Sequence, residues 1–197
     1  MIFKVTVMEE KNITLTFRND YQNMYEANYT YALLKGKLSK KYNLKVFSVT
    51  LLFFILISAS LFIEEKISLK DDIFFIIFML LIMTATLAVM QFVSRALNKA
   101  QIKNFCRMTF DYGFDKKSPA QACFDNEKLN LQSGYTKISV PYEEIDFVIS
   151  DRLNFIFSFG GENKIRNIPK INQSPDSLFN IDNLLREKLG EKFIYKM

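Results

Sequence analysis

The 197-residue sequence predicts an α+β membrane protein, in which a two-helix transmembrane hairpin is joined to a cytoplasmic β domain that ends in a helix. Two uncharged apolar runs predict the hairpin, basic residues on their outer flanks predict its orientation, and short alternating segments after residue 104 predict the β domain. We expect five parts in chain order: an N-terminal β-hairpin and amphipathic helix (1–45), a first transmembrane helix (46–63), an external loop (64–72), a second transmembrane helix (73–94), and a basic juxtamembrane helix with the β domain (95–197).

Within the N-terminal part, alternating apolar residues predict a β-hairpin over residues 1–19, with strands around Phe3, Val5 and Val7 and around Ile13, Leu15 and Phe17. An isolated hairpin is marginally stable in water, so we expect it to dock on another sheet. Asn19 or Asp20 then caps a predicted helix of about twenty residues towards Lys41. Tyrosines at 21, 25 and 29 recur on one face of this helix, which favours amphipathic packing over an aromatic recognition surface.

The two apolar runs are long enough to cross a bilayer. Residues 46–63 and 73–94 hold no charged side chain over 18 and 22 positions, and about 20 helical residues span the hydrocarbon core. Buried helices of soluble proteins normally keep a polar stripe, which neither run has. The absence of ionisable residues inside the runs argues against a transport pathway. Small residues in both runs favour packing within the hairpin or between copies of the chain, so a homo-oligomer is an open alternative.

Basic residues on the outer flanks of the runs predict the orientation. The connecting residues 64–72 carry two lysines and four acids, whereas the outer flanks carry no acid between residues 35 and 45 or between 95 and 107. Since Lys and Arg near a membrane stay on its cytoplasmic side, both termini are expected in the cytoplasm of a multi-pass inner-membrane protein. We call these flanking residues the basic collar: Lys35, Lys37, Lys40, Lys41, Lys45, Arg95, Lys99, Lys103 and Arg107.

After the second run the apolar period changes from that of a helix to that of strands. Strands are predicted at 105–111, 119–124, 128–133, 136–141, 145–150, 154–159 and 163–168, separated by turn residues such as Gly160-Gly161. A final amphipathic helix begins at Ser174-Pro175-Asp176 and ends before Gly190. Seven short strands followed by one helix are the layout of a pleckstrin-homology-like half-barrel plugged by its C-terminal helix.

Short motifs in this region resemble a known family. They are VPYEEIDFV at residues 140–148, NFIF at 154–157 and IPK at 168–170. With two close membrane helices and a basic helical exit, they make the chain similar to the YcxB-like family of bacterial membrane proteins over nearly its whole length. The resemblance implies a pleckstrin-homology-like cytoplasmic domain on a membrane hairpin. It implies no established activity and no catalytic residues.

Composition and motifs argue against an enzyme. The chain has no histidine, which excludes His-metal sites and His-dependent triads, and it lacks glycine-rich phosphate loops. The adjacent pair Glu143-Glu144 is predicted to be a solvated turn or strand edge, because neighbouring strand residues point to opposite sides. The two cysteines, Cys106 and Cys123, match no metal pattern and are expected to be reduced cytosolic thiols. We therefore expect no catalytic residues, no metal and no cofactor.

The net charge of +5 first suggests a nucleic-acid partner, but its distribution argues against one. Residues 108–197 hold 12 basic and 13 acidic side chains, and outside the basic collar the chain has 17 basic and 21 acidic residues. The expected function is a membrane-tethered interaction module for an unknown protein partner, with a regulatory, scaffold or immunity role. An anionic-lipid sensor and an accessory subunit of a membrane complex are the alternatives.

Overall fold

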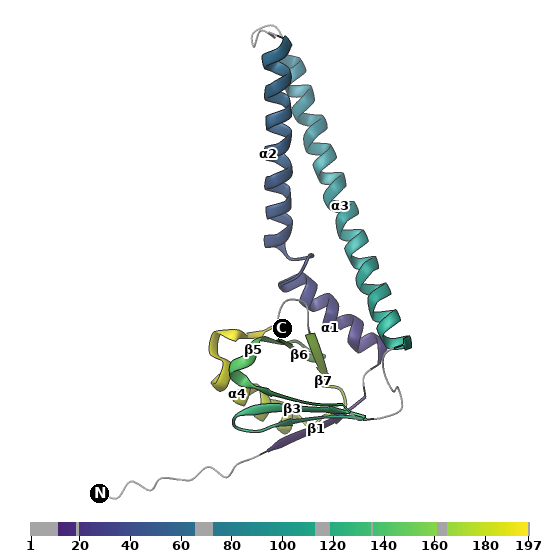
Figure 1. The fold of residues 1–197 in the computed structure, drawn as a ribbon, viewed down its shortest axis with the longest axis vertical. Helices are drawn as coiled ribbons and strands as arrows, with labels where there is room; N and C mark the ends of the chain where they lie inside the picture. The colour runs from purple at the N-terminus through teal and green to yellow at the C-terminus, as the bar shows by residue number, and fades with distance from the viewer. Residues whose placement is uncertain are drawn as a thin grey trace, which may run out of the picture. The chain divides into compact units, whose positions relative to one another are not determined.

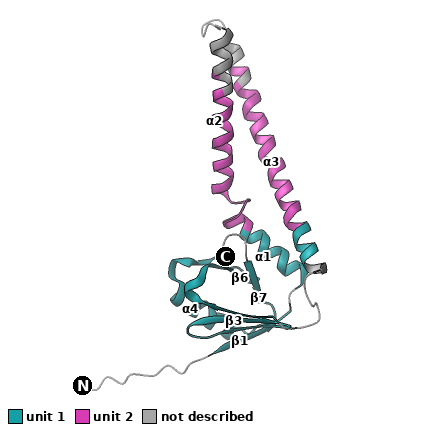
Figure 2. Ribbon diagram, viewed as in Figure 1, with its two compact units in different colours: residues 1–31, 104–197 teal, residues 32–103 magenta. Residues whose placement is uncertain are grey.

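The protein is described from a computed structural model, which describes residues 12–18, 20–65, 73–112, 119–134, 136–160 and 165–196. In these ranges the chain is an α+β protein with four α-helices and two four-stranded sheets (Figure 1). It divides into two compact units (Figure 2). The β unit joins residues 1–31 to 104–197, and the helical unit comprises residues 32–103. The predicted N-terminal part, 1–45, is thus divided between the two units.

The first sheet joins the N-terminal strand to strands that follow more than 100 residues later. All neighbouring strands are antiparallel, and β1 pairs with β2 from Ile13 opposite Phe124 to Phe17 opposite Ala120. Helices α1 (Tyr21–Leu34), α2 (Lys40–Glu65) and α3 (Ile73–Tyr112) are therefore an insertion between two hydrogen-bonded neighbours. The sheet order is β1 (Ile13–Phe17), β2 (Ala120–Phe124), β3 (Lys128–Ser133) and β4 (Thr136–Pro141).

The second sheet follows after a short 3-10 turn, Tyr142–Glu144. Its order is β7 (Ile165–Pro169), β6 (Asn154–Phe159), β5 (Ile145–Ser150) and β8 (Phe193–Tyr195). Strand β8 runs parallel to β5, and the other neighbours are antiparallel. Gly160, at the end of β6, has a φ of 72°, a conformation that favours glycine at the predicted turn.

The main core contains side chains of both sheets and of α4 (Pro175–Leu189). Phe124 of β2 lies with its ring centroid 6.1 Å from that of Phe157 on β6, so aromatic packing joins the two sheets. Helix α4 buries Ile181, Leu185 and Leu189. The Ser174 side chain accepts a hydrogen bond from the Ser177 backbone N–H, and Gly190 follows the last turn, as the sequence predicts.

The prediction of one helix from residue 20 to Lys41 is wrong, because the chain turns between α1 (Tyr21–Leu34) and α2 (Lys40–Glu65). A Cβ atom on Gly36 would lie 2.8 Å from Ala32 Cα, so the backbone approaches too closely for any other residue. Ser39 then starts α2, since its hydroxyl accepts a hydrogen bond from the Tyr42 backbone N–H at 3.2 Å.

The predicted strand at 105–111 is also wrong, because α3 (Ile73–Tyr112) is one continuous helix of 40 residues. Its i,i+4 repeat of basic residues from Arg95 to Arg107 is a helical pattern, and Cys106 is fully buried with its Sγ 3.9 Å from the Met24 carbonyl oxygen. Strand β1 supplies the seventh strand instead. The three-residue strand β8 was not predicted.

The remaining strand predictions agree with the structure within one or two residues. Those at 128–133, 136–141, 145–150 and 154–159 are confirmed to the residue. Strand β1 docks on β2, as expected for an N-terminal strand that is not stable alone. The predicted strand around Phe3, Val5 and Val7 lies outside the described residues.

Candidate functional site

The first candidate site is the basic collar, whose nine side chains are all exposed. Lys35 and Lys37 lie in the turn before α2, the next three in the first two turns of α2, and the last four along α3. Lys45 lies 20 residues before the end of α2 and Arg95 lies 22 residues after the start of α3. At a rise of about 1.5 Å per residue, both lie roughly 30 Å from the ends that face the connecting loop. Counted along each helix, the two basic segments therefore begin at similar distances from the connecting loop.

Between these basic segments and the connecting loop, most of the described side chains of α2 and α3 are apolar and many of them are exposed, whereas Met83 and Leu87 of α3 are buried. Phe53 on α2 and Phe92 on α3 are 63% and 76% exposed. Other large apolar side chains with more than half of their surface exposed are Val49, Leu52, Ile55, Leu56, Phe78, Leu80, Leu81, Val89 and Met90. Within the described residues, one helical stretch, Leu80–Thr109, is long and apolar enough to cross a membrane, and 11% of its most apolar window is buried.

A half-buried chain of hydrogen-bonded polar side chains lies at one end of the second sheet, on the side of α4. Lys170 donates a hydrogen bond from Nζ to Ser150 Oγ at 2.7 Å, and Ser150 donates from Oγ to Asp182 at 2.9 Å. The Lys170 ammonium also lies 4.1 Å from the centre of the Phe155 ring. A lysine beside a serine hydroxyl is a pattern of some hydrolases, but Ser150 is 0% exposed and its hydroxyl already donates to a carboxylate. The arrangement ties β5, the end of β7 and α4 together.

We expect Lys170 to give the β unit a distinctive pH dependence. Burial lowers the pKa of Lys170 from its ordinary value of 10.5, against the opposite effect of the Asp182 and Asp151 carboxylates. The folded chain therefore binds this proton less tightly than the unfolded chain, so stability rises with pH from the lowered pKa up to about 10.5. In Lys170→Met this rise should disappear, as measured by denaturant midpoints at pH 7 and pH 10. Equal pH dependence in both proteins would contradict the assignment.

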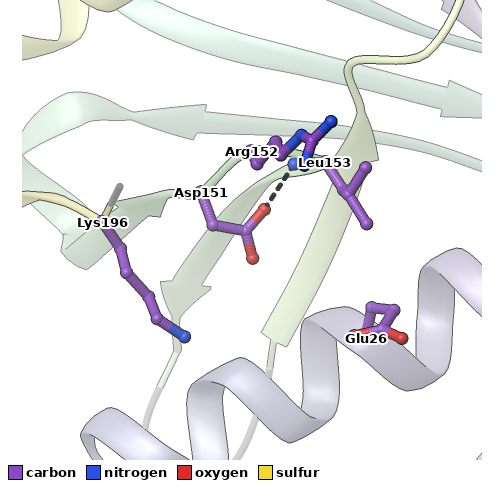
Figure 3. A pocket seen from close by; sticks show the side chains of 5 residues that line it. All are labelled: Glu26, Asp151, Arg152, Leu153 and Lys196. Atoms are coloured by element: carbon purple, nitrogen blue, oxygen red, sulfur yellow. Dashed lines mark hydrogen bonds between the residues drawn. The ribbon is translucent and has the colours of Figure 1, made fainter.

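A cleft of about 320 Å³ lies between α1 and the same end of the second sheet (Figure 3). Asp151 accepts hydrogen bonds from the backbone N–H groups of Leu153 at 2.8 Å and Asn154 at 2.7 Å, which fixes the turn between β5 and β6. Figure 3 shows Lys196 and Asp151 pointing from the sheet towards the helix that carries Glu26. The lining residues are Glu26, Asp151, Arg152, Leu153 and Lys196.

The chemistry of this cleft is that of a small charged surface. Its two acids and two bases balance, and among the described residues no three His, Cys, Asp or Glu side chains are grouped to hold a metal ion. Sequence reasoning missed the cleft because its walls come from α1, the β5–β6 turn and the segment after β8. No spacing along the chain indicates that these three segments meet.

The other residues singled out from the sequence take structural roles. Glu143 and Glu144 are exposed in the 3-10 turn, as predicted. Tyr21, Tyr25 and Tyr29 stack in sequence along α1, with ring centroids 6.3 and 6.0 Å apart. Cys106 and Cys123 are free thiols, and only Cys123 has exposed surface.

Comparison with known proteins adds no relative, since no family model, curated protein or solved structure matches the chain. The fold alone therefore defines the class of protein. It is an α+β chain in which apolar and basic helices are inserted between two adjacent strands of a sheet.

Proposed function

We propose that the chain is an integral inner-membrane protein that presents a cytoplasmic, pleckstrin-homology-like interaction module and has no enzymatic role. The observation that carries the proposal is the pairing of β1 with β2 across the helical insertion. Backbone hydrogen bonds hold Phe17 and Ala120 opposite each other, so the chain leaves and re-enters the β unit on one side of any membrane. The inserted segment must then cross that membrane an even number of times.

This parity argument supports a two-helix hairpin. If the apolar part of α3 crosses the bilayer, a second crossing must occur between β1 and β2, and α2 is the other long apolar helix described there. Each large apolar side chain left in water costs about 1.5–3 kcal/mol relative to burial, so the exposed residues of α2 and α3 favour lipid as their surroundings. The basic collar supports an orientation with both termini in the cytoplasm.

The β unit supports the role of an interaction module. Strands β1–β4 form one antiparallel set and strands β5–β7 another, and helix α4 follows them. This is the order expected of a pleckstrin-homology-like half-barrel. The resemblance to YcxB-like proteins points the same way. The Ser150 hydroxyl is buried and already paired, so it is not open to a substrate, and a protein partner, in a regulatory, scaffold or immunity role, is the function we favour.

In-cell photo-crosslinking of the full chain tests this function. A photoreactive residue at Phe179, which is 66% exposed on α4, should trap one defined protein. The matched control at Phe92, 76% exposed on α3, should trap lipid. Recovery of only lipid or copies of the same chain from the Phe179 position would overturn the proposed module. A second membrane protein trapped from Phe92 would instead support an accessory subunit of a membrane complex.

An anionic-lipid sensor is the second candidate, favoured by the i,i+4 basic stripe on α3. The length of α3 limits how many of these basic residues can reach the lipid headgroups. If the bilayer core ends near residue 94, Arg107 lies 13 residues further on, or about 20 Å along the helix axis. The headgroup layer is only about 5–8 Å thick on each side. Arg95 and Lys99 therefore fit headgroup contact in a helix near the membrane normal, whereas Lys103 and Arg107 lie beyond it.

A further inference from the structure

The feature that carries a further inference is the contact between α1 and the outer face of the second sheet. Ala27 packs against Ile149 and Ile156, and the ring of Tyr31 stacks on Phe147 with centroids 6.0 Å apart and planes within 4°. This cluster contains three buried residues, whereas the main core of the β unit contains 16. The apolar contact between α1 and the second sheet is therefore small, and to this contact the helix contributes a methyl group and one aromatic ring.

A buried polar side chain, Asn154 of β6, lies at the same interface. Asn154 is 0% exposed, and neither atom of its carboxamide has a hydrogen-bond partner among the described residues. Strand alternation puts Asn154 on the same face of β6 as Ile156, which is the α1 face. On α1 itself, Asn23 and Thr30 are also buried, and the Asn23 side chain donates to the Asp20 carboxylate at 3.2 Å. A buried amide without partners destabilises the docked arrangement, because water would satisfy it if α1 moved away.

The cleft described above further reduces the packing between α1 and the second sheet. Glu26 neighbours Ala27 on α1, and it lines the cleft opposite Asp151, Leu153 and Lys196, so part of the helix faces a cleft rather than packed side chains. On another side, α1 contacts the cytoplasmic end of α3, where Cys106 Sγ lies 3.9 Å from the Met24 carbonyl oxygen. Helix α1 is thus held by a small contact with the second sheet and another with α3. The contact with the sheet includes the unpaired carboxamide of Asn154.

We infer that α1 docks reversibly on the second sheet and that its release, which hydrates Asn154, is a conformational switch between the β unit and the helices. Helix α1 leads directly through the Gly36 turn into α2. A change at either end of α1 therefore shifts its docking equilibrium. Because all of these contacts lie within the chain, this inference does not rest on the proposed interaction partner.

Hydrogen exchange on the full chain in lipid nanodiscs tests the switch. An undocked α1 of 14 residues is too short to remain helical in water, so its amides report release directly. In the unaltered protein, α1 amides should exchange at least about tenfold faster than those of β2 and β3. Asn154→Leu, which removes the unpaired amide and keeps the branched shape of the side chain, should slow α1 exchange about tenfold and leave β2 and β3 unchanged.

Two further variants complete the test. Tyr31→Ala should speed α1 exchange about tenfold with no change in the first sheet, and it remains informative if Asn154→Leu does not fold. Ser158→Ala is the matched control, since Ser158 is 3% exposed on the same strand but its hydroxyl pairs with Asp146 at 3.3 Å. It should not slow α1. Exchange of α1 as slow as that of β2 and β3, or faster exchange in Asn154→Leu, would overturn the inference.

Discussion

Deleting residues 46–63 should abolish folding of the β unit, although none of its residues is removed. With one apolar helix left, an inserted chain crosses the membrane once, and β1 and β2 then lie on opposite sides. Strand β1 places Leu15 and Phe17 in the core at 1% and 8% exposure. Losing these two side chains and the edge ladder removes a large part of the roughly 5–15 kcal/mol that stabilises a domain. Limited proteolysis of membranes should show complete loss of the protected β unit.

The matched control removes both predicted spans. Replacing residues 46–94 by a flexible linker of about 20 Gly and Ser residues restores an even number of crossings, namely zero. The entropy of closing such a linker grows only slowly with its length, so β1 can still reach β2. This variant should keep the protease-resistant β unit in soluble form. Protection in the single-span variant, or loss of protection in the linker variant, would contradict the parity argument.

Phe157→Ala should have the second-largest effect, a loss of about 3–5 kcal/mol in the free energy of unfolding. Phe157 is 0% exposed on β6 and packs at 6.1 Å from Phe124 of the first sheet, so its removal leaves a cavity where the two sheets meet. Denaturant unfolding of the full chain in detergent, followed by circular dichroism of the strands, measures the change.

Phe179→Ala provides the comparison, because the same side chain is 66% exposed on α4. Surface substitutions away from special features usually change stability by less than about 0.5 kcal/mol. Similar losses for both phenylalanines would mean that the main core does not lie between the sheets and α4.

Much of the β unit could be predicted from sequence because its signals are local. The pattern KLNLQS alternates cleanly over residues 128–133, and Ser174, Pro175 and Gly190 define the ends of α4 through backbone chemistry. Pairing is a long-range property, so the sequence could not show that the N-terminal strand lies beside β2. The three residues of β8 are likewise too few to be distinguished from a loop before their parallel pairing with β5 is known.

The strand prediction for residues 105–111 failed because two local patterns overlap there. Cys106 and Met108 alternate with Arg107 and Thr109 as in a strand, yet Cys106 is buried in helix α3, where it contacts α1. The i,i+4 spacing of the basic residues already indicated a helix there. Asn154 could not have been recognised as a candidate at all. Its sequence neighbours indicate a strand, but only the packing of α1 shows that its amide is buried without a partner.

Cysteine labelling in intact cells tests the membrane hairpin most directly. In a Cys106→Ala, Cys123→Ala background, Ser68→Cys lies in the predicted external loop and Asn180→Cys lies at an exposed position of α4. A membrane-impermeant maleimide should label Ser68→Cys in intact cells and Asn180→Cys only after permeabilisation. Labelling of Asn180→Cys in intact cells, or protection of Ser68→Cys until permeabilisation, would contradict a hairpin with both ends in the cytoplasm.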